Sequence, residues 1–145
     1  MAEILTRQFG PLEYDPAAVI EFPAGLPGFE AQRKFVLIER PSVAPILFLE
    51  SLDSPELCFP AVPISAIDPQ YELAMTPEDA RLLGSDRLEN VVCLAILTAA
   101  PEGPLTANLL APVVIDPQSR RAVQAVRMDK RYSHRHSVGQ EPACS

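Results

Sequence analysis

The chain has few of the residues and patterns from which small catalytic or metal-binding domains are built. Among its 145 residues are two histidines and three cysteines, and Cys58, Cys93 and Cys144 are too far apart for a CxxC or zinc-ribbon pattern. Nucleophile-elbow, Walker, dinucleotide-binding and HExxH patterns are also missing. We therefore expect a protein that is not an enzyme and that holds no metal and no cofactor.

Long apolar stretches are missing as well. No run reaches the roughly 18 residues that a membrane-spanning helix needs, and the charged start MAEILTRQF lacks the apolar segment of a secretion signal. Cys58 and Cys93 stand inside short apolar runs, so we expect both to be buried thiols. These features predict a cytoplasmic protein that makes no membrane contact.

Proline is abundant, with 16 residues scattered from Pro11 to Pro142, while 48% of the chain is apolar. The apolar share is sufficient for a core, but proline ends helices and interrupts inner strands. We therefore expect an all-β fold: a small antiparallel β-barrel-like single domain over residues 1–137, with one short helix. Residues 138–145 are expected to form a mobile C-terminal tail.

The expected strands are short apolar or alternating segments bounded by turn residues, at 3–9, 12–14, 19–22, 35–38, 46–49, 57–62, 91–98, 109–115 and 122–126. The run 91–98 is the longest and predicts a central strand. The run 57–62 holds Pro60 and is followed by Pro63, which predicts an edge strand.

One helix start stands out at Thr76-Pro77-Glu78-Asp79. Thr76 is suited to cap free backbone N–H groups, and Pro77 suits the first helical position. The two acidic residues suit the positive end of the helix dipole, and Asp79 completes a capping box with Thr76. Gly84 predicts the end of the helix after about two turns.

The net charge of −7 is unevenly distributed. Residues 50–116 hold 11 acidic and 2 basic residues, whereas residues 117–136 hold 6 basic residues and one acidic residue. An acidic surface repels nucleic acid and attracts basic proteins, although it also serves simply to keep a protein soluble. Tyr132 is the one aromatic residue of the basic segment, so direct RNA binding is a weak hypothesis.

The two histidines, His134 and His136, could place two ligands on one face of a strand. Glu141 and Cys144 are the nearby residues that could complete a metal site. The competing hypothesis to a binding module is therefore a ligand-binding or hydrolytic barrel that uses His134, His136 and Glu141. The simpler interpretation is an exposed histidine pair.

The segment 21–30 reads EFPAGLPGFE, which predicts two consecutive turns. Gly25 and Gly28 supply positive-φ positions, and Pro23 and Pro27 fix the backbone before them. The apolar side chains of this structural motif are expected to fold back onto the core, namely Phe22, Leu26 and Phe29.

The segment 106–115 reads TANLLAPVVI. An asparagine amid apolar residues must have its amide hydrogen-bonded, so Asn108 is predicted to hold a neighbouring turn. Taken singly, each of these two segments is best interpreted as a turn that defines the fold.

Together the two segments resemble the flagellar assembly factor family FliW, and the resemblance extends from Leu12 to His136. Further matching segments are KFVL at 34–37, Asp-Pro followed by Tyr71-Glu72, Asn-Val-Val at 90–92, and YSHRH at 132–136. The family usually ends Tyr-Ser-Thr-Arg-His-Pro, and here His134 replaces the threonine and Ser137 the proline.

The resemblance implies a small β-barrel-type regulator that binds flagellin in the cytoplasm. It also implies binding to the carbon storage regulator CsrA, a basic RNA-binding dimer that represses flagellin translation. The resemblance further implies that the protein antagonises CsrA noncompetitively and so couples flagellin translation to flagellum assembly. We expect mainly apolar contacts with an acidic rim, made by Tyr71, Glu72, Leu105, Asn108, Leu110 and Pro112.

Overall fold

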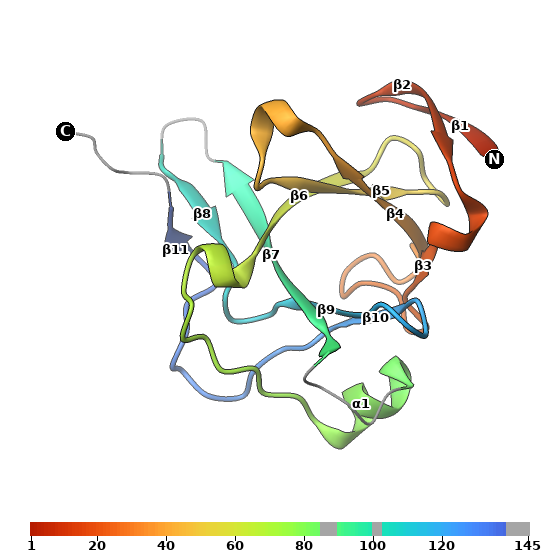
Figure 1. Cartoon of the computed structure of the whole chain (residues 1–145). Helices are drawn as coiled ribbons and strands as arrows, with labels where there is room; N and C mark the ends of the chain where they lie inside the picture. Colours follow the sequence, from red (N-terminus) through yellow and green to blue (C-terminus); the bar gives the residue numbers. More distant parts are fainter. Residues whose placement is uncertain (85–89, 100–102, 139–145) are drawn as a thin grey trace.

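The computed structural model describes residues 1–84, 90–99 and 103–138, which form mostly short strands (Figure 1). The strands are β1 (Ala2–Thr6), β2 (Gly10–Tyr14), β3 (Ile20–Glu21), β4 (Lys34–Glu39), β5 (Leu47–Ser51), β6 (Cys58–Pro63), β7 (Val92–Ala99), β8 (Leu105–Ala107), β9 (Val113–Asp116), β10 (Arg121–Gln124) and β11 (His136–Ser137). The helix α1 spans Pro77–Leu83, and three single 3-10 turns occupy Pro16–Ala18, Pro41–Val43 and Ile64–Ala66. The predicted strand-rich fold with one short helix is confirmed.

Seven strands close into a barrel in the order β7-β6-β5-β4-β3-β10-β9, because β9 pairs back with β7. The barrel is antiparallel except for the pairing of β3 with β10, which is parallel. β7 pairs with β6, β8 and β9, so the prediction of a central strand is confirmed. Beyond the barrel, β8 and β11 extend the sheet from β7 (Figure 1).

The prediction that residues 57–62 form an edge strand is wrong, since β6 lies between β5 and β7. β6 pairs with β5 over Cys58–Ala61 and with β7 over Ala61–Pro63. Pro60 is therefore paired on one side only, and so is Pro63. An inner strand tolerates these prolines because each stands where one neighbouring strand is absent.

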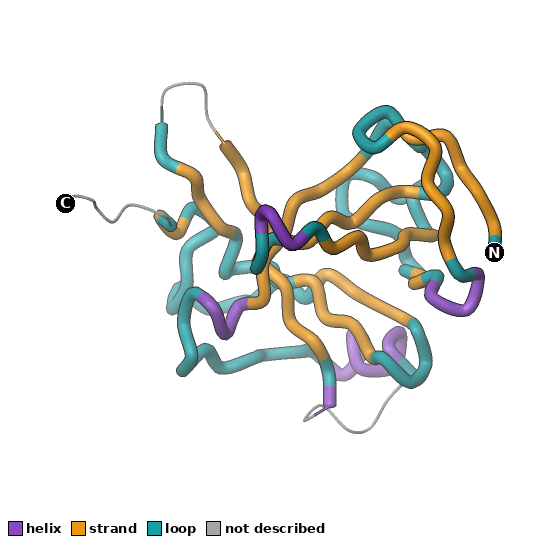
Figure 2. Tube along the Cα trace, turned by 45° about the horizontal axis from the view of Figure 1, so that its top comes forward, coloured by secondary structure: helices purple, strands orange, loops and turns teal. Residues whose placement is uncertain are grey.

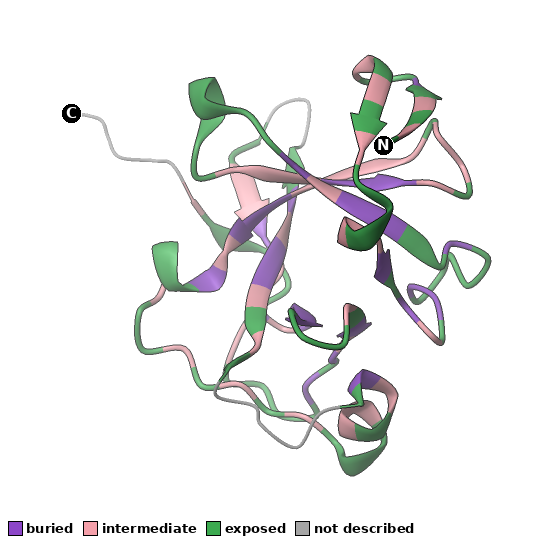
Figure 3. Ribbon diagram, turned by 45° about the vertical axis from the view of Figure 1, so that its right-hand side comes forward, coloured by how far each residue is buried: buried purple, intermediate pink, exposed green. Residues whose placement is uncertain are grey.

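The core inside the barrel is built around Phe22 and Phe35, whose rings meet edge to face at 5.1 Å between centroids. A second apolar cluster covers the outer face of β7 and β8 and includes Ala107 and Leu109. A third lies under α1 and includes Leu83. Figure 3 shows the buried residues concentrated along the barrel strands, while the N-terminal hairpin is exposed or half-buried except at Thr6.

Helix α1 begins and ends as predicted. The Oγ1 atom of Thr76 accepts a hydrogen bond from the backbone N–H of Asp79 at 3.1 Å. Gly84 closes the helix with a φ of 73°. No helix of the described residues is long and apolar enough to cross a membrane.

The hairpin of β1 and β2 forms a two-stranded sheet of its own beside β4 and β5 (Figure 2). Its tip lies over the outer face of β5, because the ring of Phe9 packs on Phe48 at 5.3 Å and the Arg7 N–H donates to the Pro55 carbonyl at 3.3 Å. On the same outer face, Glu50 is completely buried. An acidic side chain is thus enclosed outside the barrel interior, beside Cys58 and near Glu56.

The cysteines differ from the prediction. Cys58 and Cys93 are half-buried thiols, not fully buried ones. Cys93 packs against the two apolar clusters outside the barrel, whereas the Cys58 thiol lies beside the Glu50 carboxylate. Cys144 lies outside the described residues. Val138, the first residue of the predicted tail, donates its N–H to the Leu105 carbonyl of β8 at 3.0 Å. The rest of the predicted tail lies outside the described residues.

Candidate protein-interaction site

The segment 21–30 makes the two turns that its glycines and prolines predict. Gly25 and Gly28 have φ values of +71° and +84°. The Gly25 N–H donates to the Phe22 carbonyl at 2.9 Å, and the Phe29 N–H donates to the Leu26 carbonyl at 2.7 Å. A Cβ at Gly25 would lie 2.4 Å from the Glu30 carbonyl oxygen, so this position requires glycine both for its φ and for its space.

Two of the three apolar side chains of this motif fold back as expected. Phe22 and Leu26 are buried in the barrel core. Phe29 is 43% exposed, so its expected burial is wrong. The second turn reverses the chain before Phe29, and the ring instead packs edge to face on Phe59 with 5.5 Å between centroids. The motif thus ends in an exposed aromatic ring.

Side chains of the segment 105–109 alternate between two faces of β8, as an extended strand requires. Leu105, Ala107 and Leu109 pack into the outer apolar cluster, whereas Thr106 and Asn108 point to the opposite face and line a surface groove. Four of these positions, 106–109, belong to the TANLLAP element, so this element contributes side chains both to the outer apolar cluster and to the groove.

Asn108 holds a turn, as predicted. Its Oδ1 atom accepts hydrogen bonds from the N–H groups of Leu110 at 3.1 Å and Ala111 at 3.0 Å. Leu109 is buried and Leu110 is half-buried, in agreement with the expectation that one of the two faces inward. Pro112 is fully buried, so the structure gives this predicted partner-binding residue no surface to offer.

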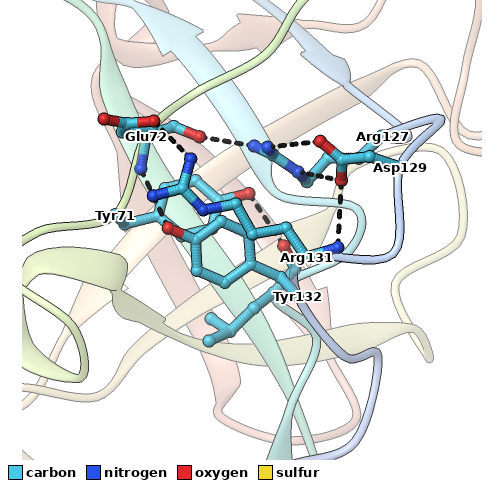
Figure 4. A network of polar contacts seen from close by, with 7 residues as sticks. Tyr71, Glu72, Arg127, Asp129, Arg131 and Tyr132 are labelled. Carbon is cyan, nitrogen blue, oxygen red and sulfur yellow. Dashed lines mark hydrogen bonds and ion pairs between the residues drawn. The ribbon is translucent and has the colours of Figure 1, made fainter.

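Tyr71 and Glu72 lie beside the TANLLAP element although they are distant in sequence (Figure 4). The Tyr71 hydroxyl donates to the Leu109 carbonyl at 2.7 Å. The rings of Tyr71 and Tyr132 are 4.3 Å apart, and the Glu72 N–H donates to the Tyr132 hydroxyl at 3.3 Å. Burial raises the pKa of the Tyr71 phenol, so its hydroxyl stays protonated and remains a donor.

Arg127 holds Tyr71, Glu72 and Tyr132 in position. Its guanidinium is buried, lies 4.7 Å from the Tyr132 ring centroid and donates to the Glu72 carbonyl. The Nε and Nη2 atoms donate to the two oxygens of Asp129, each at 2.9 Å. This two-pronged contact holds the pKa of the Asp129 carboxyl below its usual value. A planar, permanently charged group thus fixes two aromatic rings and one peptide carbonyl.

The Glu72 carboxylate points outward and pairs with Arg131. Both side chains are more than half exposed, so water screens the pair and it contributes little to stability. Two carboxylates of the acidic middle, Glu50 and Asp116, are buried, so they add no charge to the surface that a partner meets. No local sequence pattern predicts the contacts of Arg127, Asp129 and Arg131. The available signal was the opposite net charge of residues 50–116 and residues 117–136, which favours contact between the two segments.

The structure divides the predicted partner-binding residues. Tyr71 and Leu105 pack on the outer apolar cluster, with Glu72 exposed beside them. Asn108 lies on the opposite face of β8. The outer group, which we call the Tyr71 face, consists of Tyr71, Glu72, Leu105 and Tyr132. Leu110 is half-buried and accepts a hydrogen bond from the Arg127 N–H at its carbonyl.

The histidine pair is exposed, and His136 pairs in register with Ala107 at the start of β11. Within residues 1–84, 90–99 and 103–138, neither histidine forms an ion pair, and no three side chains of metal-binding type gather. Glu141, the third residue of the competing hypothesis, lies outside the described residues.

Comparison with known proteins agrees with the sequence motifs. The family model described as FliW protein matches residues 3–138. The flagellar assembly factor FliW of Syntrophomonas wolfei is 32% identical over 139 residues, covering 95% of this chain and 89% of that protein. The factor of Bacillus subtilis is also 32% identical, covering 95% of this chain and 97% of its own.

The fold comparison points the same way. A crystal structure of the flagellar assembly factor FliW superposes with a TM-score of 0.84 at 29% identity, covering 94% of this chain and 96% of that one. Sequence motifs, family model and fold thus agree over nearly the whole chain, and this chain belongs to the FliW family of flagellar assembly factors.

Proposed function

We propose that this protein is a cytoplasmic regulator that binds flagellin and the translational repressor CsrA. Flagellin and CsrA compete for it, so that export of flagellin frees the protein to dock beside the RNA site of CsrA and relieve repression. Membership of the flagellar assembly factor family supports the general role. The Tyr71 face supports a binding role in particular.

The observation that carries the proposal is the fixed position of the Tyr71 face. Arg127 holds the Glu72 carbonyl and the Tyr132 ring, and Tyr71 is bonded to the Leu109 carbonyl. A partner that docks here does not have to order these groups, each of which would otherwise cost about 0.5–1.5 kcal/mol per immobilised side chain. Such preorganised aromatic and arginine groups are typical of binding hot spots.

Charge refines the proposal for the basic partner. Glu72 offers a carboxylate at the rim, but Arg131 already pairs with it. A basic dimer must therefore compete with Arg131 for Glu72, which makes this contact useful for steering and weak as a source of affinity. The half-buried side chain of Leu105, packed on the outer apolar cluster, supplies the apolar part of the contact.

The test is a binding measurement by surface plasmon resonance with purified CsrA and with flagellin. Leu105→Arg should weaken both interactions at least tenfold, and Glu72→Gln should slow association with CsrA. Glu13→Gln, at an exposed acidic position on β2, is the matched control and should change neither. Circular dichroism confirms that each variant folds, and unchanged binding by a folded Leu105→Arg protein would refute this placement.

A further inference from the structure

A groove of about 460 Å³ opens on the opposite side of β8 from the Tyr71 face. It lies where β6 and β7 part. Their pairing begins at Ala61 with Ile96, while β7 from Leu97 onward pairs with β8 instead. Phe59 stands on one side of the gap and Thr98 on the other. Its volume is within the usual range of ligand-binding clefts, 300–1,000 Å³.

Three segments that are distant in sequence meet at this groove. The double turn of residues 21–30 contributes Leu26, Pro27 and Phe29, the TANLLAP element contributes Thr106 and Asn108, and the YSHRH segment contributes His134 and Arg135. The turns explain the glycines and prolines of the first segment, but they do not explain its exposed phenylalanine. A ring that is 43% exposed at the edge of a groove is available for contact.

The two walls of the groove differ in polarity. One wall is apolar, formed by the double turn together with Phe59 and Ile96. The other carries Asn108, whose side-chain N–H groups donate no hydrogen bond within the described part of the chain, and the exposed Arg135. Among the residues that the structure describes, no carboxylate lines the groove, although the whole chain has a net charge of −7.

We infer that this groove is a second docking site, which takes a protein segment with large apolar side chains flanked by carboxylates. The inference rests on the proposed function, because it assumes that the ligands of this chain are proteins. Apolar side chains of the bound segment pack against the apolar wall between Phe29 and Ile96. A carboxylate of the same segment forms an ion pair with Arg135. The acidic segment and a basic partner then bind opposite faces of β8.

The experiment uses the full, isotope-labelled chain and two synthetic amphipathic peptides of about 14 residues. Both carry the same leucine and phenylalanine face, flanked by glutamates in one and by lysines in the other. In a two-dimensional NMR titration, the glutamate peptide should shift the amide signals of Phe29, Thr106 and Arg135, and it should bind at least tenfold more tightly than the lysine peptide.

Substitution of exposed cations supplies the control. Arg135→Glu should reverse the preference between the two peptides, whereas Lys130→Glu, an equal charge change outside the groove, should leave it unchanged. Equal affinities for both peptides, signal shifts confined to the Tyr71 face, or an Arg135→Glu variant with unchanged preference would each overturn the inference. Self-association in place of peptide binding, seen by analytical ultracentrifugation, would also overturn it.

The two proposals fail separately. A chain that binds CsrA and flagellin but neither peptide refutes the groove and leaves the proposed function in place. A chain that binds the glutamate peptide at Phe29 and Thr106 but neither of these proteins refutes the proposed function and retains the groove.

Discussion

Replacing Glu50 by Gln should change how the stability of the protein depends on pH. The Glu50 side chain is fully buried on the outer face of β5, and neither carboxylate oxygen accepts a well-formed hydrogen bond from the described residues. Burial raises the pKa of Glu50 from 4.5 to about 7, the nearby Cys58 thiol offsets part of this, and Glu56 adds to it. The folded protein therefore holds this proton more tightly than the unfolded chain does.

The sign and size follow from proton linkage. Between pH 4.5 and 7 the folded state binds more protons than the unfolded state, so the free energy of unfolding falls as pH rises and then levels off. The full difference in pKa corresponds to about 3 kcal/mol. Relaxation and water entry around the carboxylate reduce this, and we expect about 1.5 kcal/mol.

The assay is urea unfolding of the wild type and of Glu50→Gln at pH 5 and pH 8. The buried amide of Gln has its own cost, but this cost is the same at both pH values and cancels in the comparison. Part of this effect is already lost at pH 5, so the variant should gain about 1 kcal/mol relative to wild type on going from pH 5 to pH 8. Glu3→Gln, at an exposed position on β1, should gain nothing. A difference between variant and wild type that is independent of pH would refute the reasoning.

Three further predictions concern the turns, the Tyr71 face and the encounter with partners. Gly25→Ala should cost about 2–3 kcal/mol in urea unfolding, because a Cβ there meets the Glu30 carbonyl, whereas Gly28→Ala, with positive φ and open space, should cost about 1 kcal/mol. Arg127→Lys should lower stability by about 2 kcal/mol, since lysine cannot make the two-pronged contact to Asp129 or lie flat on the tyrosine ring; a melting temperature equal to wild type would contradict this. Association with CsrA should slow as salt rises from 0.01 to 0.15 M, more steeply than association with flagellin, and equal salt slopes in surface plasmon resonance would remove any steering role for the acidic middle.

Local chemistry was the part of the fold that the sequence could predict. Thr76 and Gly84 mark the ends of α1 because caps depend on a few neighbouring residues, and Gly25 marks a turn for the same reason. The position of β6 in the sheet was missed because Pro60 constrains one side of a strand and does not reveal whether the other side is paired.

The candidate site was predicted in part. Tyr71 and Glu72 were grouped with residues of the TANLLAP element as expected partner contacts, and the hydrogen bond from Tyr71 to Leu109 brings the two segments together. The role of Arg127 could not be predicted, since it depends on a contact with Glu72, 55 positions away. Phe29 was expected in the core because apolar character predicts burial, whereas the backbone turn decides where that side chain points.

The closure of the barrel has a consequence for synthesis of the chain. β3 pairs with β4 on one edge and with β10 on the other, where Glu21 is in register with Arg121. The second edge of β3 therefore stays unpaired until β10, 100 positions later, has left the ribosome. At roughly 5–20 residues per second, translation leaves this edge exposed for about 5–20 s. Open strand edges pair with other chains. A ribosome stalled before β10 should therefore release an aggregating fragment, and a chaperone that covers β3 and β4 in that interval should raise the yield of folded protein.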